Sequence, residues 1–110
     1  MSTLRNHVQL IGRLGNDPQI KTFDSGKKMA SFSLATNEKY RNSKGEQVED
    51  TQWHNIVVWG KKADLVENYL KKGSEVGVQG KLVNRSYESN GDKKYITEIN
   101  MNELLMLDKK

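Results

Sequence analysis

The sequence predicts a mainly β protein: a small closed barrel of five short strands, with one helix between the third and fourth strands. Three observations support this prediction. The chain has 110 residues, which is the size of a single domain. Apolar residues occupy every second position in most of its segments, as they do in half-buried strands. Helical periodicity occurs in one segment, which lies in the second half of the chain.

The first two strands are predicted at residues 8–14 and 30–36. In the first, apolar residues or glycine occupy alternate positions, and a turn with the only proline of the chain ends it. In the second, one face carries Ala30, Phe32 and Leu34, whereas the other face has only small side chains. A face of small residues allows another backbone or a flat ligand to come close.

Two segments are predicted to be connections. Residues 19–23 lead into a turn that contains Gly26. Residues 39–50 are polar, with Gly45 near their middle, and predict a long hairpin loop. The third strand follows directly, at residues 51–59.

The helix is predicted at residues 61–72. Its apolar stripe at helical spacing is formed by Leu65, Val66, Tyr69 and Leu70. Lys71 and Lys72 suit the negative end of the helix dipole, and Gly73 is expected to end the helix.

Two further strands are predicted at residues 75–85 and 95–101. In the fourth strand, the residues expected to face the core are Val76, Val78, Gly80 and Leu82. Asn90 and Gly91 predict a tight hairpin turn between the two strands, because Asn-Gly accepts positive φ angles.

The predicted elements make up one domain. Residues 103–107 are apolar enough to pack against it, so we expect the domain to span residues 1–107 and residues 108–110 to be a stub. The order of strands and helix is typical of the oligonucleotide-binding (OB) fold, in which the helix plugs the barrel.

The composition excludes several classes of function. The absence of cysteine excludes a disulfide framework, a thiolate zinc site and a cysteine nucleophile. His7 and His54 are too few and too far apart for an ordinary zinc site, so we expect no metal or cofactor. Apolar runs do not exceed four residues, so neither a membrane span nor a secretory signal is predicted and a cytoplasmic protein is expected. The net charge of +4 is compatible with a polyanionic partner.

Both tryptophans lie in the third strand. Residues two apart share a face of a strand, so Trp53 and Trp59 point the same way, while Ile56 and Val58 point into the core from the other face. Large aromatic residues usually fill the core, and that alternative stays open for each tryptophan. Two of them on one polar face favour an exposed aromatic platform.

Two tyrosines lie in polar, charged segments. Tyr40 and Tyr87 have no apolar neighbours in sequence that would draw them into a core, although a tyrosine can also cover the base of a loop. Tyr69 and Tyr95 are expected to be structural, because one belongs to the helical stripe and the other to the last strand.

Basic residues accompany the aromatic residues along the chain. Those near an aromatic or on the fourth strand are Lys39, Arg41, Lys61, Lys62, Lys81 and Arg85. Any one of these basic residues, taken alone, is explained as a solvated charge at the protein surface. Together, however, aromatic faces that stack on bases and cations that neutralise phosphates are what sequence-independent single-strand binding requires.

Four segments of the chain resemble the bacterial-type single-stranded DNA-binding proteins. They are residues 6–18 (NHVQLIGRLGNDP), 32–37 (FSLATN), 52–61 (QWHNIVVWGK) and 69–74 (YLKKGS). The resemblance implies an OB-fold barrel that assembles into dimers and usually tetramers. It also implies binding and protection of single-stranded DNA during replication, recombination and repair, without catalysis and in association with the nucleoid.

The resemblance also assigns residues. It places base-stacking aromatics at Tyr40, Trp53, Trp59 and Tyr87, and phosphate contacts at Lys61, Lys72 and Arg85. Arg41, Lys62 and Lys81 are expected to add phosphate contacts. His54 falls at a subunit interface, and Val8 and Leu10 of the first strand are expected there too.

Members of that family continue beyond the barrel into a flexible linker and an acidic tip that recruits partner proteins. This sequence ends at Asp108-Lys109-Lys110. Recruitment of replication and repair partners is therefore expected only if the sequence has been cut from a longer protein.

Three other functions are conceivable for this sequence. An enzyme is disfavoured, because Gly60-Lys61 lacks the glycine spacing of a phosphate-binding loop and no catalytic constellation is evident. A tailless, primosomal-type OB-fold protein that mainly binds partner proteins is the principal alternative, and the Trp53/Trp59 pair argues against it. RNA binding stays open, because nothing in the sequence reads a 2′-hydroxyl group.

Overall fold

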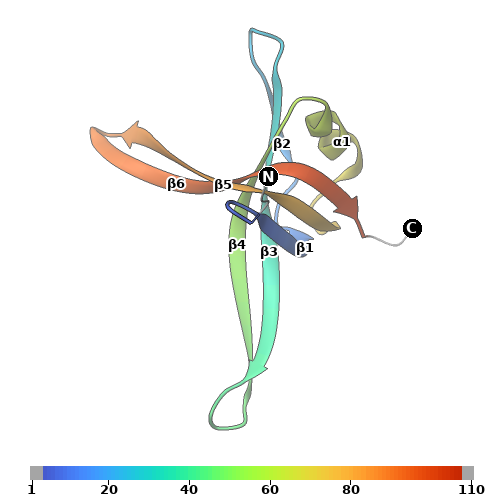
Figure 1. The fold of residues 1–110 in the computed structure, drawn as a ribbon, viewed down its shortest axis with the longest axis vertical. Coiled ribbons are helices and arrows are strands. Elements are labelled where there is room, and N and C mark those ends of the chain that lie inside the picture. The colour runs from blue at the N-terminus through green and yellow to red at the C-terminus, as the bar shows by residue number, and fades with distance from the viewer. Residues whose placement is uncertain (1–3, 108–110) are drawn as a thin grey trace.

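The computed structural model describes residues 4–107 as one continuous sheet of six strands with a single helix (Figure 1). The stub predicted at residues 108–110 lies outside the described residues. The elements in chain order are β1 (Val8–Leu14), β2 (Gln19–Thr22), β3 (Lys28–Arg41), β4 (Gln47–Trp59), α1 (Lys61–Tyr69), β5 (Glu75–Ser89) and β6 (Asp92–Met106).

Five of the strands close into a barrel, as predicted. The strand order is β1-β5-β6-β4-β3-β2, and β1 also pairs with β3, at Arg13 with Ala35 and at Leu14 with Leu34. Gly12 allows this closure, because a Cβ there would lie 2.1 Å from the Ala35 carbonyl oxygen. Among the described residues, the sixth strand, β2, pairs only with β3. It was not predicted, because its four residues are too few to show an alternating pattern.

The barrel interior is filled by the inward-facing residues of the alternating strands. The fully buried larger side chains are Leu34, Ile56, Val58, Val66, Val76 and Val78. The helix α1 contributes Ala63 and Val66 to this core, so it plugs the barrel as the OB fold requires. It is also tied to β3 by Lys28, which forms ion pairs with Asp64 at 2.6 Å and with Glu67. Hydrogen bonds to these carboxylates raise the pKa of Lys28.

The prediction of a long hairpin loop at residues 39–50 is wrong. The strands β3 and β4 stay paired as far as Arg41 and Gln47, and only residues 42–46 form the loop. Asn42 holds that loop, since its Oδ1 accepts hydrogen bonds from the backbone N–H groups of Lys44 at 2.9 Å and Glu46 at 3.0 Å. In an antiparallel ribbon, the backbone N–H and C=O groups are hydrogen-bonded to the partner strand. When both faces of the ribbon are in water, its sequence needs no alternation of apolar and polar residues, so the strands cannot be recognised from that pattern.

The helix is shorter than predicted. It ends at Tyr69, because Leu70 is extended (φ −106°, ψ 145°) and turns its buried side chain into the core. Lys71 and Lys72 therefore lie beyond the helix and do not cap its dipole. Instead, the Lys72 backbone N–H donates to Asp17 Oδ1 at 2.8 Å. This tertiary contact, across 55 residues, favours the turn over a further helical residue.

Three hairpins project from the barrel in different directions (Figure 1). They are the β2–β3 turn, the β3–β4 ribbon and the β5–β6 ribbon. Leu82 was expected to face the core, but it is exposed, because this part of β5 belongs to the projecting ribbon and not to the barrel. The projecting part of β5 begins after a shift in the β5–β6 register between Gln79 and Gly80. Within residues 4–107, α1, with nine residues, is far too short to cross a lipid bilayer.

Candidate nucleic-acid interface

All four aromatic side chains predicted to stack on bases are exposed. The exposed fractions are 52% for Tyr40, 62% for Trp53, 42% for Trp59 and 45% for Tyr87. Burial in the core, the alternative for the tryptophans, is therefore wrong. Their exposure leaves the rings accessible to a ligand, which stacking on bases requires.

Trp53 lies on the outer face of β4, opposite Ala35, with its indole ring against Gly15. A Cβ on Gly15 would lie 2.2 Å from Cζ3 of the ring. The loop beneath the ring is fixed, because the Gly15 N–H donates to the Ser33 carbonyl at 2.9 Å and Ser33 donates to Asn16 Oδ1. The small outer face of β3 thus leaves room for a loop that supports the indole.

Trp59 stacks on Phe23, with ring centroids 5.7 Å apart and an interplanar angle of 21°. Lys21 Nζ lies over the same phenylalanine ring, 5.0 Å from its centroid. Phe23 and Lys21 were not predicted as site residues, because residues 19–23 were expected to be a connection. The available signal was a basic and an aromatic residue two positions apart, which share a face of an extended strand.

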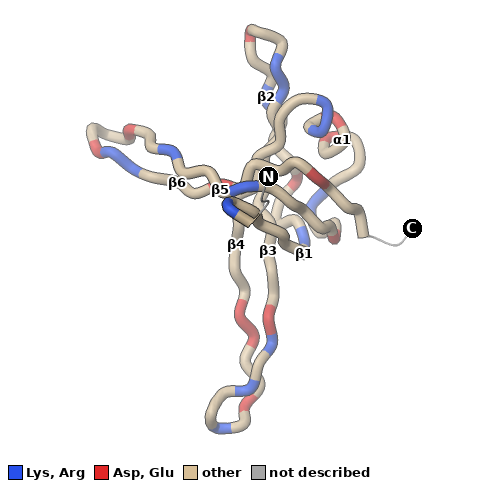
Figure 2. The backbone as a smooth tube through the Cα atoms, viewed as in Figure 1, with Lys and Arg blue, Asp and Glu red and all other residues tan. Residues whose placement is uncertain are grey.

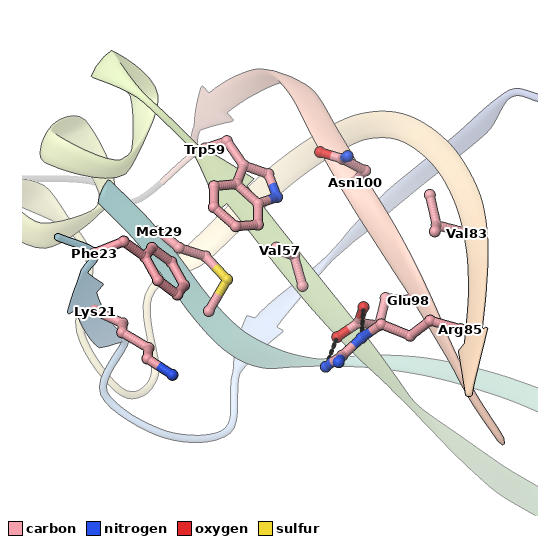
Figure 3. A pocket seen from close by; sticks show the side chains of 9 residues that line it. All are labelled: Lys21, Phe23, Met29, Val57, Trp59, Val83, Arg85, Glu98 and Asn100. Carbon is pink, nitrogen blue, oxygen red and sulfur yellow. Dashed lines mark hydrogen bonds and ion pairs between the residues drawn. The ribbon is translucent and has the colours of Figure 1, made fainter. Parts of the chain in front are cut away.

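A cavity of about 430 Å³ opens beside this ring pair (Figure 3). It is formed where β2, β3 and β4 meet the β5–β6 ribbon. Its lining residues are Lys21, Phe23, Met29, Val57, Trp59, Val83, Arg85, Glu98 and Asn100.

The β5–β6 ribbon carries Tyr87 and Tyr95 on opposite faces. Tyr87 pairs with Lys94 and Tyr95 with Ser86, which are adjacent rungs of the ladder. Tyr95 is 73% exposed and Lys93 Nζ lies 5.8 Å from its ring centroid, so the structural role expected for Tyr95 is wrong. It becomes a further candidate for stacking.

Tyr69 is exposed as well, so its expected structural role is also wrong. It lies in the last turn of α1, where Val66 and Leu70 fill the core in its place.

Tyr40 does not share a face with Trp53. The β3–β4 register pairs Tyr40 with Val48 and Ala35 with Trp53, and strict alternation along the ribbon puts these two aromatics on opposite sides. The four predicted stacking residues therefore form separate platforms on the two ribbons and the barrel, rather than one flat surface.

Arg85, predicted to contact phosphate, is bound to Glu98 across the β5–β6 ladder. Its Nε lies 2.7 Å from Glu98 Oε1 and its Nη2 lies 3.1 Å from Oε2. The hydrogen bonds to Glu98 raise the pKa of the Arg85 guanidinium. A guanidinium has five N–H groups, so three are left for another acceptor.

The other predicted phosphate ligands lie at the surface. Lys61, Lys72 and Lys81 are exposed. Lys62 Nζ donates to the Asn102 carbonyl, with Glu103 3.9 Å away, and Arg41 Nη1 donates to the Gly45 carbonyl at 3.3 Å. Figure 2 shows basic residues on all three projecting hairpins, with acidic residues among them.

The residues predicted at a subunit interface are half-buried. Val8 and Leu10 pack against the barrel's own core, and His54 Nε2 lies 3.0 Å from Thr36 Oγ1. The outward side of β1 instead exposes Ile11, which lies beside Gly77 of β5, and Gly77 in turn lies beside the exposed Leu105 of β6. Among residues 4–107, no group of three or more histidines and carboxylates is arranged to hold a metal ion.

Similar sequences and similar solved structures are single-stranded DNA-binding proteins. Single-stranded DNA-binding protein 1 of Chlorobaculum tepidum is 49% identical over 107 residues, which cover 96% of this chain and 66% of that protein. The SSB of Plasmodium falciparum, solved in complex with single-stranded DNA, superposes with a TM-score of 0.87 at 42% identity, covering 98% of this chain and 99% of that one. The single-stranded DNA-binding protein of Thermus aquaticus superposes with a TM-score of 0.82 at 26% identity, covering 94% of this chain and 50% of that one.

This chain thus spans 66% of the Chlorobaculum protein's length and half of the Thermus chain. Residues 5–107 match the model of the single-strand binding protein family. The chain belongs to the single-strand binding protein family.

Proposed function

We propose that this protein binds and protects single-stranded DNA independently of base sequence, during replication, recombination and repair. The observation that carries the proposal is the exposure of Trp53 and Trp59, each on a support formed by the fold. Gly15 lies under one indole ring and Phe23 stacks on the other. Duplex DNA keeps its base faces stacked, so these rings favour single strands.

Stacking supplies enough free energy for this function. Each base stacked on an aromatic side chain contributes about 1–3 kcal/mol, so four platforms contribute on the order of 4–12 kcal/mol before the cost of ordering the strand. The four platforms in the proposal are Tyr40, Trp53, Trp59 and Tyr87.

Basic residues complete the proposed site by neutralising phosphates. Lys61, Lys72 and Lys81 have exposed ammonium groups for this purpose. Arg41, Lys62 and Arg85 each donate to an acceptor within the protein and have further N–H donors. No bond is made or broken in this function, so we propose a binding protein and not an enzyme.

We propose that the protein acts as a homo-oligomer. Two observations support this. The row formed by Ile11, Gly77 and Leu105 is an apolar patch on the outer face of the sheet. Within residues 4–107, β1 pairs with β3 only at Arg13 and Leu14, so the same edge of its earlier residues is open to a strand of a second copy. His54, Val8 and Leu10 remain the predicted contacts.

The proposed domain is residues 1–107, and its proposed location is the cytoplasm, at the nucleoid, where DNA is unwound. Partner recruitment by an acidic tail belongs to the proposal only for a longer form of the protein.

The test is a fluorescence titration with oligo-dT. Because Trp53 and Trp59 are proposed to stack on bases, we expect strong quenching of tryptophan emission by oligo-dT and little by a duplex of equal length. The solution mass, measured with and without dT, distinguishes dimer from tetramer. Absence of quenching would favour the partner-binding alternative, and oligo-U in a parallel titration measures the preference for DNA over RNA.

A further inference from the structure

The cavity beside Trp59 has the size and character of a small-ligand site. Its volume of about 430 Å³ lies within the range of about 300–1,000 Å³ found for ligand pockets. Such pockets are mostly apolar with a few polar groups, and this one combines two aromatic rings and three apolar side chains with four polar residues.

One side of the cavity is aromatic. Figure 3 shows Phe23 and Met29 beside Trp59, with Val57 in the middle of the pocket. Since Trp59 and Phe23 already stack on each other, they present a preformed wall and lose little freedom when a flat ligand contacts them. A nucleobase has the flat, weakly polar face that such a wall accepts.

Two cations flank the same cavity. Lys21 and Arg85 come from different hairpins and lie on separate sides of the opening (Figure 3). Glu98 fixes the guanidinium of Arg85 through two hydrogen bonds and leaves three N–H groups unused. A base inside the cavity therefore has positive charge beside it for its phosphates.

Asn100 offers hydrogen bonds to the edge of a base. It lies opposite Val57 in the β4–β6 pairing, and Figure 3 shows its amide turned toward the side where Trp59 lies. Its side chain is half-buried and has no hydrogen bond to another of residues 4–107. An amide presents one donor group beside one acceptor and can exchange them by rotating, so it matches the Watson–Crick edge of any base.

We propose that this cavity is a subsite for one nucleotide of the strand. The base lies against the Trp59–Phe23 wall, its edge hydrogen-bonds the Asn100 amide, and its phosphates contact Lys21 and Arg85. The proposal rests on the proposed function and adds a polar contact that tolerates every base.

The test is to make this contact selective. A carboxylate only accepts hydrogen bonds, so Asn100→Asp accepts from the N4 amino group of cytosine and opposes the O4 atom of thymine. With dC and dT strands of equal length, we expect the ratio of Kd for dT to Kd for dC to rise about fivefold or more over the unmodified protein. Asn68→Asp adds the same charge on α1, away from the cavity, and is expected to leave the ratio unchanged.

A second variant tests the aromatic wall. Phe23→Leu keeps apolar bulk but removes the ring, and we expect it to weaken dT binding about fivefold or more while circular dichroism stays unchanged. An unchanged dT-to-dC ratio in a folded Asn100→Asp protein, or unchanged affinity in Phe23→Leu, would overturn the subsite. If the unmodified protein fails to bind oligo-dT, the proposed function itself fails, so the two failures are distinguishable.

Discussion

The indole ring of Trp53 rests on Gly15, so closely that a methyl group on Gly15 would lie 2.2 Å from Cζ3 of the ring. These residues are far apart in sequence, and no side chain other than glycine leaves the ring in place. Gly15 is therefore a positioning residue for the proposed base-stacking platform.

Gly15→Ala is expected to weaken binding of single-stranded DNA without removing any aromatic group. The methyl group displaces the exposed ring, so the loss approaches that of removing one stacked base, about 1–3 kcal/mol. A double-mutant cycle with Trp53→Ala checks the cause, because most of the effect of Gly15→Ala on binding is expected to vanish once the ring is absent, and only the contact of the methyl group with Ser33 Oγ at 2.9 Å remains. Equal losses in both backgrounds would show that Gly15 acts independently of Trp53.

Trp53→Ala is expected to lower affinity for oligo-dT by about 1–3 kcal/mol and to leave the melting temperature nearly unchanged. The reason is that the ring is 62% exposed and contributes little to the core. Tyr69→Ala is the matched control, since it removes a ring that is 65% exposed from α1, outside the proposed site. A large fall in the melting temperature of Trp53→Ala would instead assign that ring a structural role.

Lys61→Ala is expected to change the salt dependence of binding. For single strands, log Kobs falls with log salt by about 0.7 per phosphate neutralised, so loss of one contact reduces the slope by about that amount. Trp53→Ala, which removes stacking but no charge, serves as the comparison and is expected to keep the slope of the unmodified protein. A slope in Lys61→Ala equal to that of the unmodified protein would remove Lys61 from the phosphate contacts.

Gly12→Ala is expected to destabilise the barrel. Its Cβ would lie 2.1 Å from the Ala35 carbonyl oxygen, a backbone atom in the pairing that closes the barrel, so the strands must separate. Overpacking of this kind costs about 1–3 kcal/mol, measurable by urea unfolding. Gly77→Ala is the control, because its Cβ would meet its nearest atom at 3.6 Å, an ordinary contact. Similar unfolding curves for the two variants would refute the argument.

Much of the site could be predicted because one strand carries both tryptophans. Alternation in residues 51–59 places Ile56 and Val58 in the core, so Trp53 and Trp59 must face outward, as the structure shows. Alternation is a local property of the backbone, and a single sequence displays it wherever one face of the strand is buried.

The same reasoning failed where burial no longer controls the pattern. On the β3–β4 ribbon both faces are in water, so its residues are polar. Their polarity predicted a loop, but they form a regular ladder of paired strands. On the β5–β6 ribbon, Leu82 and Tyr95 continue an apolar pattern beyond the barrel and are exposed.

The sequence by itself determined the strands, the helix between them and the outward direction of both tryptophans, because each depends on the spacing of neighbouring residues. The order of these elements then indicated the fold class. Only the tertiary structure decided which residues support the candidate site. Gly15 lies under Trp53, Phe23 stacks on Trp59, and Glu98 binds Arg85. These contacts join residues at least 13 positions apart, on different strands or loops. Their geometry follows from strand register and barrel closure, which periodicity alone does not specify.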